Sequence, residues 1–379
     1  MKILISLIFI SIYSSVYSYE VIRDPFYESY FKNLSKEYST SKANVYLIEN
    51  DDLNAFVIND SIYFTTGMIK SIQHEDMLKS IYFHEAGHVH YNHYEAKVIN
   101  IESNKNKKIF NNLLSIGVAM LSSDAAIGLA TGISLDNNLL SQISNRSIRF
   151  EIQADNYMFE KINENQINTE DLINFFNRLP DNKDNFFKSH PTHSDRIILL
   201  KRFIQNKKKN NSIEFEWIKA KYALDSNVQE FNNFFMNLEK GVIKIDNLKS
   251  KINNNYINYE IYKKGMKMKN INEMFLDITK KNSNTYLKIE FFNYIVDNNI
   301  IENFELIEKN KHNIDLQEEY FFYYIYGKYY KKIKKDALSN FYFCQFYTLV
   351  KVKDKINYFC KKYDKRDISE LDKSYALFK

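Results

Sequence analysis

The sequence predicts a mainly α-helical protein with a small antiparallel sheet in an N-terminal α+β domain, followed by an all-α region. Three observations lead to this fold class. The 379 residues include 8 glycines and 3 prolines, so few residues end helices. Short apolar runs at 45–48, 54–58 and 62–65 have the length of strands. No proline follows Ser212, and aromatic and aliphatic residues recur there at helical spacing.

The N-terminal half is expected to begin with a helix over residues 25–42, ahead of the three strands. Asn59-Asp60 has the composition of a turn, so the second and third strands should form a hairpin. Gly67 is expected to end that hairpin. A helix predicted from about residue 75 to residue 97 follows it.

Further helices are expected downstream, at 146–161, 169–179 and 195–205. The polar run from Lys207 to Asn211 is the expected domain boundary. The chain should therefore consist of a signal peptide at 1–18, a first domain at 19–206 and a helical domain at 207–379.

One aromatic cluster of the C-terminal region resembles a degenerate tetratricopeptide repeat, with Tyr323, Tyr326, Gly327 and Tyr330 followed by Phe343. The small residues of a regular repeat are displaced or replaced, so a helical-repeat solenoid and an irregular bundle both stay open. Aromatic residues at this spacing usually form a core. The alternative is a peptide-binding groove, through which these helices would hold a protein partner.

The N-terminus has the anatomy of an export signal. Lys2 precedes an apolar run from Ile3 to Val16, and cleavage is expected after Ser18. An uncleaved anchor is the alternative, but the run is short for a bilayer span. The mature protein is therefore expected outside the cytoplasm.

The two cysteines, Cys344 and Cys360, leave two alternatives open. In an oxidising compartment they would form a disulfide between neighbouring helices. Two buried free thiols fit the sequence nearly as well.

Charge and composition argue against nucleic-acid binding. The formal charge of +5 is mild and scattered along the chain, and the 29 tyrosines reflect a general compositional bias. Residues 113–135 are the most apolar stretch after the signal. A membrane span and a buried helical hairpin are both open, and Ser122-Ser123-Asp124 in the middle favours the hairpin. Membrane contact is therefore not required.

The motif His84-Glu85-Ala86-Gly87-His88 indicates a catalytic metal site. Residues four apart lie on one helix face, so His84 and His88 can bind the same metal ion, and Glu85 can take a proton from a metal-bound water. The alternative is a surface helix with solvated side chains. Catalytic zinc needs a third protein ligand.

Glu151 and Asp155 supply a candidate, because they are also four residues apart and share a helix face. Glu151 can ligate the metal. Asp155 can accept a hydrogen bond from the second ring nitrogen of a ligand histidine and thereby select its tautomer. If these two acidic residues are considered alone, an ordinary acidic helix face is the simpler interpretation.

Together these motifs resemble the M48 family of zinc metallopeptidases, which includes the periplasmic beta-barrel-assembly-enhancing protease. The resemblance covers roughly residues 25–205 and rests on elements in the family order, which are Asn54-Ala55-Phe56, Gly67, His84 to His88, His93, Arg146, Glu151 to Asp155, His190-Pro191 and Arg196. It implies a zincin-like first domain.

The resemblance implies one Zn²⁺ per chain, held by His84, His88 and Glu151, with Glu85 as the catalytic base. His190 would lie near the metal, either stabilising the oxyanion or blocking the open position. Arg196 is expected to pair with a carboxylate and, with Asp155, to support the ligands. His90, His93 and His193 are expected to be surface or packing residues.

The expected function is that of a periplasmic metalloendopeptidase, in which Glu85 assists the attack of zinc-bound water on polypeptide substrates. A substrate would bind as an extended strand along residues 54–65. Misfolded or stalled cell-envelope proteins are the expected substrates. The alternative is an exported helical scaffold or chaperone whose metal site is regulatory or self-inhibited.

Overall fold

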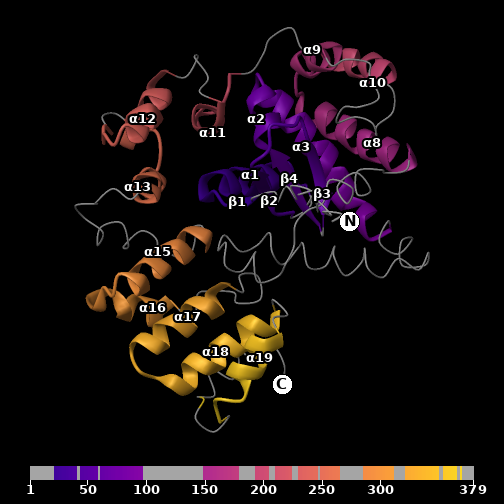
Figure 1. Cartoon of the computed structure of the whole chain (residues 1–379). Helices are drawn as coiled ribbons and strands as arrows, with labels where there is room; N and C mark the ends of the chain where they lie inside the picture. The colour runs from indigo at the N-terminus through magenta and orange to yellow at the C-terminus, as the bar shows by residue number, and fades with distance from the viewer. Residues whose placement is uncertain are drawn as a thin grey trace, which may run out of the picture.

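The structure is a computed structural model, and it describes residues 21–40, 43–58, 60–96, 148–178, 193–204, 210–223, 229–245, 248–264, 285–310, 321–349, 353–364 and 368. The predicted mainly α fold with a small sheet is confirmed (Figure 1). The N-terminal half contains β1 (Val21–Ile22), α1 (Pro25–Glu37), β2 (Val45–Ile48), β3 (Ala55–Ile58), β4 (Ser61–Thr65), α2 (Thr66–Ser71), α3 (Glu75–His90), α8 (Ile148–Asn165), α9 (Glu170–Arg178), α10 (His193–Leu200) and the 3₁₀ turn η2 (Lys201–Phe203).

The regular secondary structure described in the second half is helical. It contains α11 (Ile213–Ala223), α12 (Gln229–Glu239), η3 (Leu248–Ser250), α13 (Asn254–Lys263), α15 (Thr285–Asp297), η4 (Ile301–Asn303), α16 (Phe304–Asn310), α17 (Phe321–Lys332), α18 (Asp336–Leu349) and α19 (Lys353–Cys360). In Figure 1 the sheet, α3 and α8 lie at one end of the molecule, and α16 to α19 lie at the other.

The sheet is mixed, which corrects the prediction of an antiparallel sheet. Its strand order is β1-β2-β4-β3, and β2 and β4 run parallel, with Val45 opposite Ile62. The predicted hairpin of β3 and β4 is present and antiparallel. Strand β3 runs antiparallel to β2 but does not lie beside it. Strand β4 follows β3 in the hairpin and pairs between the two, parallel to β2 and antiparallel to β3. As a result β3 forms an edge of the described sheet.

Helix α1 packs against the sheet and contacts α3, which also packs on the sheet. Asp24 caps the helix by accepting hydrogen bonds from the backbone N–H groups of Phe26 and Tyr27, at 2.9 and 3.2 Å. On its buried face, the Phe31 ring lies 5.4 Å from the Phe64 ring of β4 and 5.3 Å from the Tyr82 ring of α3. This aromatic layer holds α3 at a defined position beside the sheet.

Gly67 has a different role from the one predicted. The hairpin ends at Thr65, whose hydroxyl accepts a hydrogen bond from the Met68 N–H and so caps α2. Gly67 is the second residue of α2, and its N–H bonds the Asn50 carbonyl at 2.8 Å. A Cβ atom there would lie 2.1 Å from the Asp51 carbonyl oxygen, so glycine is required by close backbone contact.

The polar run at 207–211 does not separate two hydrophobic cores. Trp217 of α11 belongs to the same core as the sheet and α3, with its ring 5.6 Å from that of Phe26. The Lys219 ammonium of α11 donates hydrogen bonds to the carbonyls of Ile69 and Lys70 at the end of α2. A second core begins at Tyr259 and continues through α15 to α18. The division at 206/207 stays a prediction.

The three tyrosines that suggested a repeat are core residues. Tyr323, Tyr326 and Tyr330 of α17 are buried, and the rings of all three lie within 6.2 Å of Tyr342 on α18. They fill the contact between these two helices and do not line a groove. The structure therefore favours the packing interpretation over the peptide-binding one.

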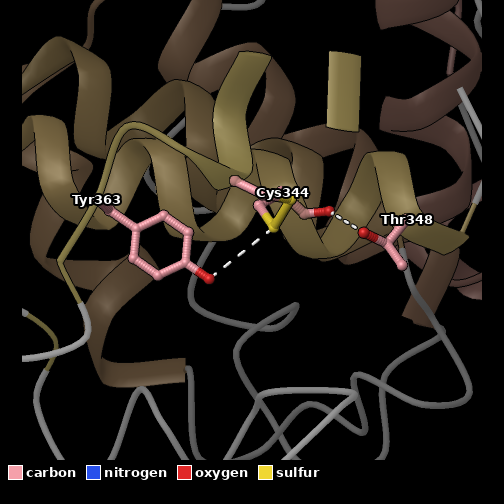
Figure 2. The surroundings of a disulfide bond; sticks show 4 residues. Cys344, Thr348 and Tyr363 are labelled. Atoms are coloured by element: carbon pink, nitrogen blue, oxygen red, sulfur yellow. Dashed lines mark hydrogen bonds between the residues drawn. A yellow bond between two sulfur atoms is a disulfide. The ribbon is translucent and has the colours of Figure 1, made fainter. Parts of the chain in front are cut away.

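Cys344 and Cys360 form a disulfide between α18 and α19, with their Cα atoms 4.9 Å apart. Figure 2 shows the Tyr363 hydroxyl directed at the Cys344 sulfur, at 3.9 Å, and the Thr348 hydroxyl donating to the Cys344 carbonyl. Of the two alternatives that the sequence left open, the structure has the disulfide.

Within the described ranges, no helix combines the length and the hydropathy needed to cross a membrane. The signal segment 1–18 and the apolar segment 113–135 both lie outside the described residues.

Replacing Gly67 by alanine is expected to lower the free energy of unfolding by about 1–3 kcal/mol, because the new methyl group meets backbone that cannot rotate away. Helix propensity alone gives the opposite sign, a stabilisation of about 1 kcal/mol. Chemical denaturation measures the difference. Lys70→Ala is the matched control, since Lys70 also contacts Asp51 but through an exposed ion pair, and about 0.5 kcal/mol or less is expected. A Gly67→Ala variant as stable as the wild type would contradict the steric account.

Candidate metal centre

Helix α3 carries both histidines of the motif on one buried face. His84 and His88 are 4% and 1% exposed, and their Nε2 atoms lie 3.2 Å apart. The i, i+4 spacing accounts for this juxtaposition, because successive turns stack residues four apart. Both Nδ1 atoms have other partners, so the two Nε2 atoms are the ones that converge.

Glu151 enters the same space from α8, which lies beside α3 (Figure 1). Its carboxylate is fully buried, with one oxygen 3.4 Å from His84 Nε2 and the other 3.5 Å from His88 Nε2. Glu151 lies 67 residues after His84 and 63 residues after His88 in the chain. One ligand atom from each of the three residues nevertheless lies within 4.8 Å of the others.

Gly87, between the two histidines, permits this approach of the helices. A Cβ atom at Gly87 would lie 3.0 Å from the Ala154 Cα and 3.1 Å from the Ala154 carbonyl oxygen, both on α8. It would also lie 3.1 Å from the Tyr157 Cβ. A larger residue would push α8 away from α3 and draw Glu151 away from the histidines. This role was not predicted from the sequence, although Gly87 and Ala154 both lie within the motifs.

The residues fit a zinc ion. Bonds of 2.0–2.2 Å with tetrahedral angles place neighbouring ligand atoms about 3.3–3.6 Å apart. Here the two Nε2 atoms lie 3.2 Å apart, and each faces a different Glu151 oxygen, at 3.4 and 3.5 Å, while one ligand atom from each residue lies within 4.8 Å of the others. Two imidazoles and one carboxylate are also the protein ligands of many catalytic zinc sites, in which the fourth position stays open.

Asp155 and Arg196 lie behind His84. The His84 Nδ1 atom is 2.8 Å from an Asp155 carboxylate oxygen, and the Arg196 guanidinium of α10 forms a buried ion pair with the same carboxylate. Burial raises the pKa of Asp155, but the Arg196 charge and the His84 contact outweigh it and lower the pKa below its usual value. An ionised Asp155 accepts the Nδ1 proton, which leaves Nε2 as the ring nitrogen that faces Glu151 and that can bind a metal ion.

His84 carries a proton readily while no cation is present. Burial lowers its pKa, but the hydrogen bonds with Asp155 and Glu151 prevail and raise the pKa to about 9. The protonated imidazole then supplies the positive charge that the two buried carboxylates require. A metal ion would replace that proton, so binding should release it.

His88 is supported differently, by His93. The two Nδ1 atoms lie 2.8 Å apart, and His93 Nε2 lies 3.1 Å from the Gln153 side-chain oxygen on α8. His93 is 5% exposed, and its ring stacks on that of Phe150 at 4.3 Å. The expectation that His93 is a surface or packing residue is therefore incomplete, because both of its ring nitrogens are engaged. The contact of Gln153 was also not predicted from the sequence.

Glu85 is buried on α3, directly after His84 in the chain. His190 and Arg146 lie outside the described residues, so the two roles considered for His190 stay predictions. His90, by contrast, is exposed at the end of α3, as expected of a surface residue.

Comparison with known proteins gives one family. Residues 25–204 match the model of peptidase family M48, and this span includes every described residue of the centre. No curated protein matches the chain. The similarity to the assembly-enhancing protease and to tetratricopeptide repeats therefore stays a prediction. The family match and the His84, His88 and Glu151 cluster together identify residues 25–204 as a metallopeptidase domain of peptidase family M48.

Proposed function

We propose that this protein is a zinc-dependent endopeptidase in which His84, His88 and Glu151 bind one Zn²⁺ and Glu85 is the general base. The observation that carries the proposal is the convergence of three buried side chains from α3 and α8, with one ligand atom from each lying within 4.8 Å of the others. When bound, the ion polarises the substrate carbonyl and lowers the pKa of water at its open position.

Glu85 provides the proton transfer. It takes a proton from the attacking water and delivers it to the leaving amine of the cleaved peptide. Its place beside His84 on a rigid, buried helix fixes the carboxylate relative to the Nε2 atoms. Asp155 and Arg196 hold the His84 ring in the tautomer that presents Nε2.

The substrate is an extended polypeptide that pairs with β3. Support comes from the position of this strand, which forms an edge of the described sheet and contacts α3, the helix that carries Glu85. Backbone pairing at a strand edge tolerates many side chains, which suits an enzyme acting on unfolded proteins.

Misfolded or stalled cell-envelope proteins are the proposed substrates, in the periplasm. Two features support this location. Residues 1–18 have the pattern of an export signal, and the Cys344–Cys360 disulfide is of the kind that persists in oxidising compartments.

Glu85→Gln is expected to reduce cleavage of casein by the zinc-loaded protein at least about 100-fold, because the amide cannot accept the proton. Zinc content should stay at one per chain, since Glu85 is not a ligand. Glu95→Gln is the control, as Glu95 is exposed just beyond α3, and it should leave cleavage unchanged. Full activity in Glu85→Gln would contradict the assignment. If the wild type takes up zinc but does not cleave casein, it is either a scaffold or a self-inhibited enzyme. The His190→Ala variant separates these two, because it should be active only if the enzyme is self-inhibited.

In cells, Glu85→Gln in place of the wild type is expected to raise the abundance of envelope proteins or to retain them in complex with the inactive chain. Quantitative proteomics of fractionated cells measures both effects, and the same fractionation locates the protein. Unchanged abundance of the envelope proteins, or location of this protein in the cytoplasm alone, would contradict the proposed substrates. The peptidase assignment itself is tested separately, by the casein assay.

A further inference from the structure

The two histidines of the centre differ in what lies behind them. His84 Nδ1 faces the carboxylate of Asp155, whereas His88 Nδ1 faces another imidazole, at 2.8 Å from the Nδ1 atom of His93. We propose that His93 and Gln153 are positioning residues that hold His88 in the tautomer and orientation needed to bind the metal. The inference rests on the proposed metal centre and extends it to two residues of no assigned role.

Only one arrangement of hydrogens suits this chain of contacts when His88 is a ligand. A ligating Nε2 must be unprotonated, so His88 carries its hydrogen on Nδ1 and donates it to His93 Nδ1. His93 then carries its own hydrogen on Nε2 and donates it to the Gln153 oxygen at 3.1 Å. The glutamine oxygen accepts and ends the chain, which therefore specifies the tautomers of both histidines.

The backbone places His93 for this contact. Helix α3 ends at His90, and Asn92 adopts a left-handed conformation with φ of 51°. This turn ends the helix, and His93, five residues after His88, lies beside it. The Asn92 N–H bonds the Val89 carbonyl at 3.0 Å and secures the turn.

Helix α8 holds the other side of His93. The Phe150 ring stacks on it with an interplanar angle of 12°, and Gln153 accepts its hydrogen bond. These two residues flank Glu151 in sequence, so the helix that supplies the carboxylate ligand also positions His93. His88 and Glu151 are thereby oriented by one shared contact between α3 and α8.

The test compares zinc affinity in three variants. His93→Phe keeps a ring against Phe150 but removes the acceptor, and it should weaken zinc binding by about 10–100-fold. His93→Asn places an amide oxygen near the position of Nδ1, and its affinity should stay within about threefold of the wild type. His90→Phe removes an exposed histidine nearby and should change nothing. Competition with a chromophoric chelator measures each dissociation constant.

Two further measurements distinguish positioning from general structure. The visible spectrum of the Co²⁺-substituted protein should change in His93→Phe and not in His93→Asn, because it reports ligand geometry, while the melting temperatures of the metal-free proteins should agree. If His93→Phe does not fold, Gln153→Ala replaces it, since Gln153 is only half-buried. This variant should weaken zinc binding by about tenfold, the lower end of the range for residues that hold a metal ligand.

Equal zinc affinity in His93→Phe, or in its substitute Gln153→Ala, and the wild type would overturn the inference. So would a His93→Asn variant as weak as His93→Phe, since the ring itself would then be what matters. A wild-type protein that binds no zinc would instead overturn the proposed function, which makes the two failures distinguishable.

Discussion

The close contact between α3 and α8 at Gly87 and Ala154 is the constraint on which the centre depends. Each helix presents its polar residues by local geometry, but neither holds a complete site. The backbones must approach until a Cβ atom at Gly87 would lie 3.0 Å from the Ala154 Cα. At that separation Glu151 reaches both histidines, and Gln153 reaches His93. Because folding has already ordered these side chains, binding an ion requires little further ordering.

Charge balance explains why the centre suits a divalent cation. Glu151 and Asp155 are buried carboxylates, and burying charge is costly unless a partner compensates it. Arg196 and a protonated His84 balance the two when no cation is present. A divalent ion in place of the His84 proton raises the charge of the centre by one unit, and the ion itself attracts an electron-rich carbonyl oxygen. The residues that balance charge within the fold therefore also favour the chemistry of peptide hydrolysis.

The local features of the site were predictable from the sequence, and the non-local ones were not. His84 with His88, and Glu151 with Asp155, follow from helical periodicity, which depends only on spacing. The parallel pairing of β2 with β4 was missed, because turn residues indicate which strands form a hairpin and not where the hairpin inserts. The role of His93 was missed because its contact with His88 depends on the left-handed turn at Asn92. The disulfide could not be predicted because it depends on how closely two helices approach.

The central claim is that two imidazoles and one carboxylate from different helices share a single ion. Zinc K-edge X-ray absorption on the purified, zinc-loaded chain tests it most directly, combined with elemental analysis of the same sample. The account predicts one zinc per chain, four nitrogen or oxygen neighbours at about 2.0–2.1 Å, and the outer-shell scattering of two imidazoles. Folded protein without zinc, or zinc whose spectrum is unchanged by Glu151→Ala, would contradict it.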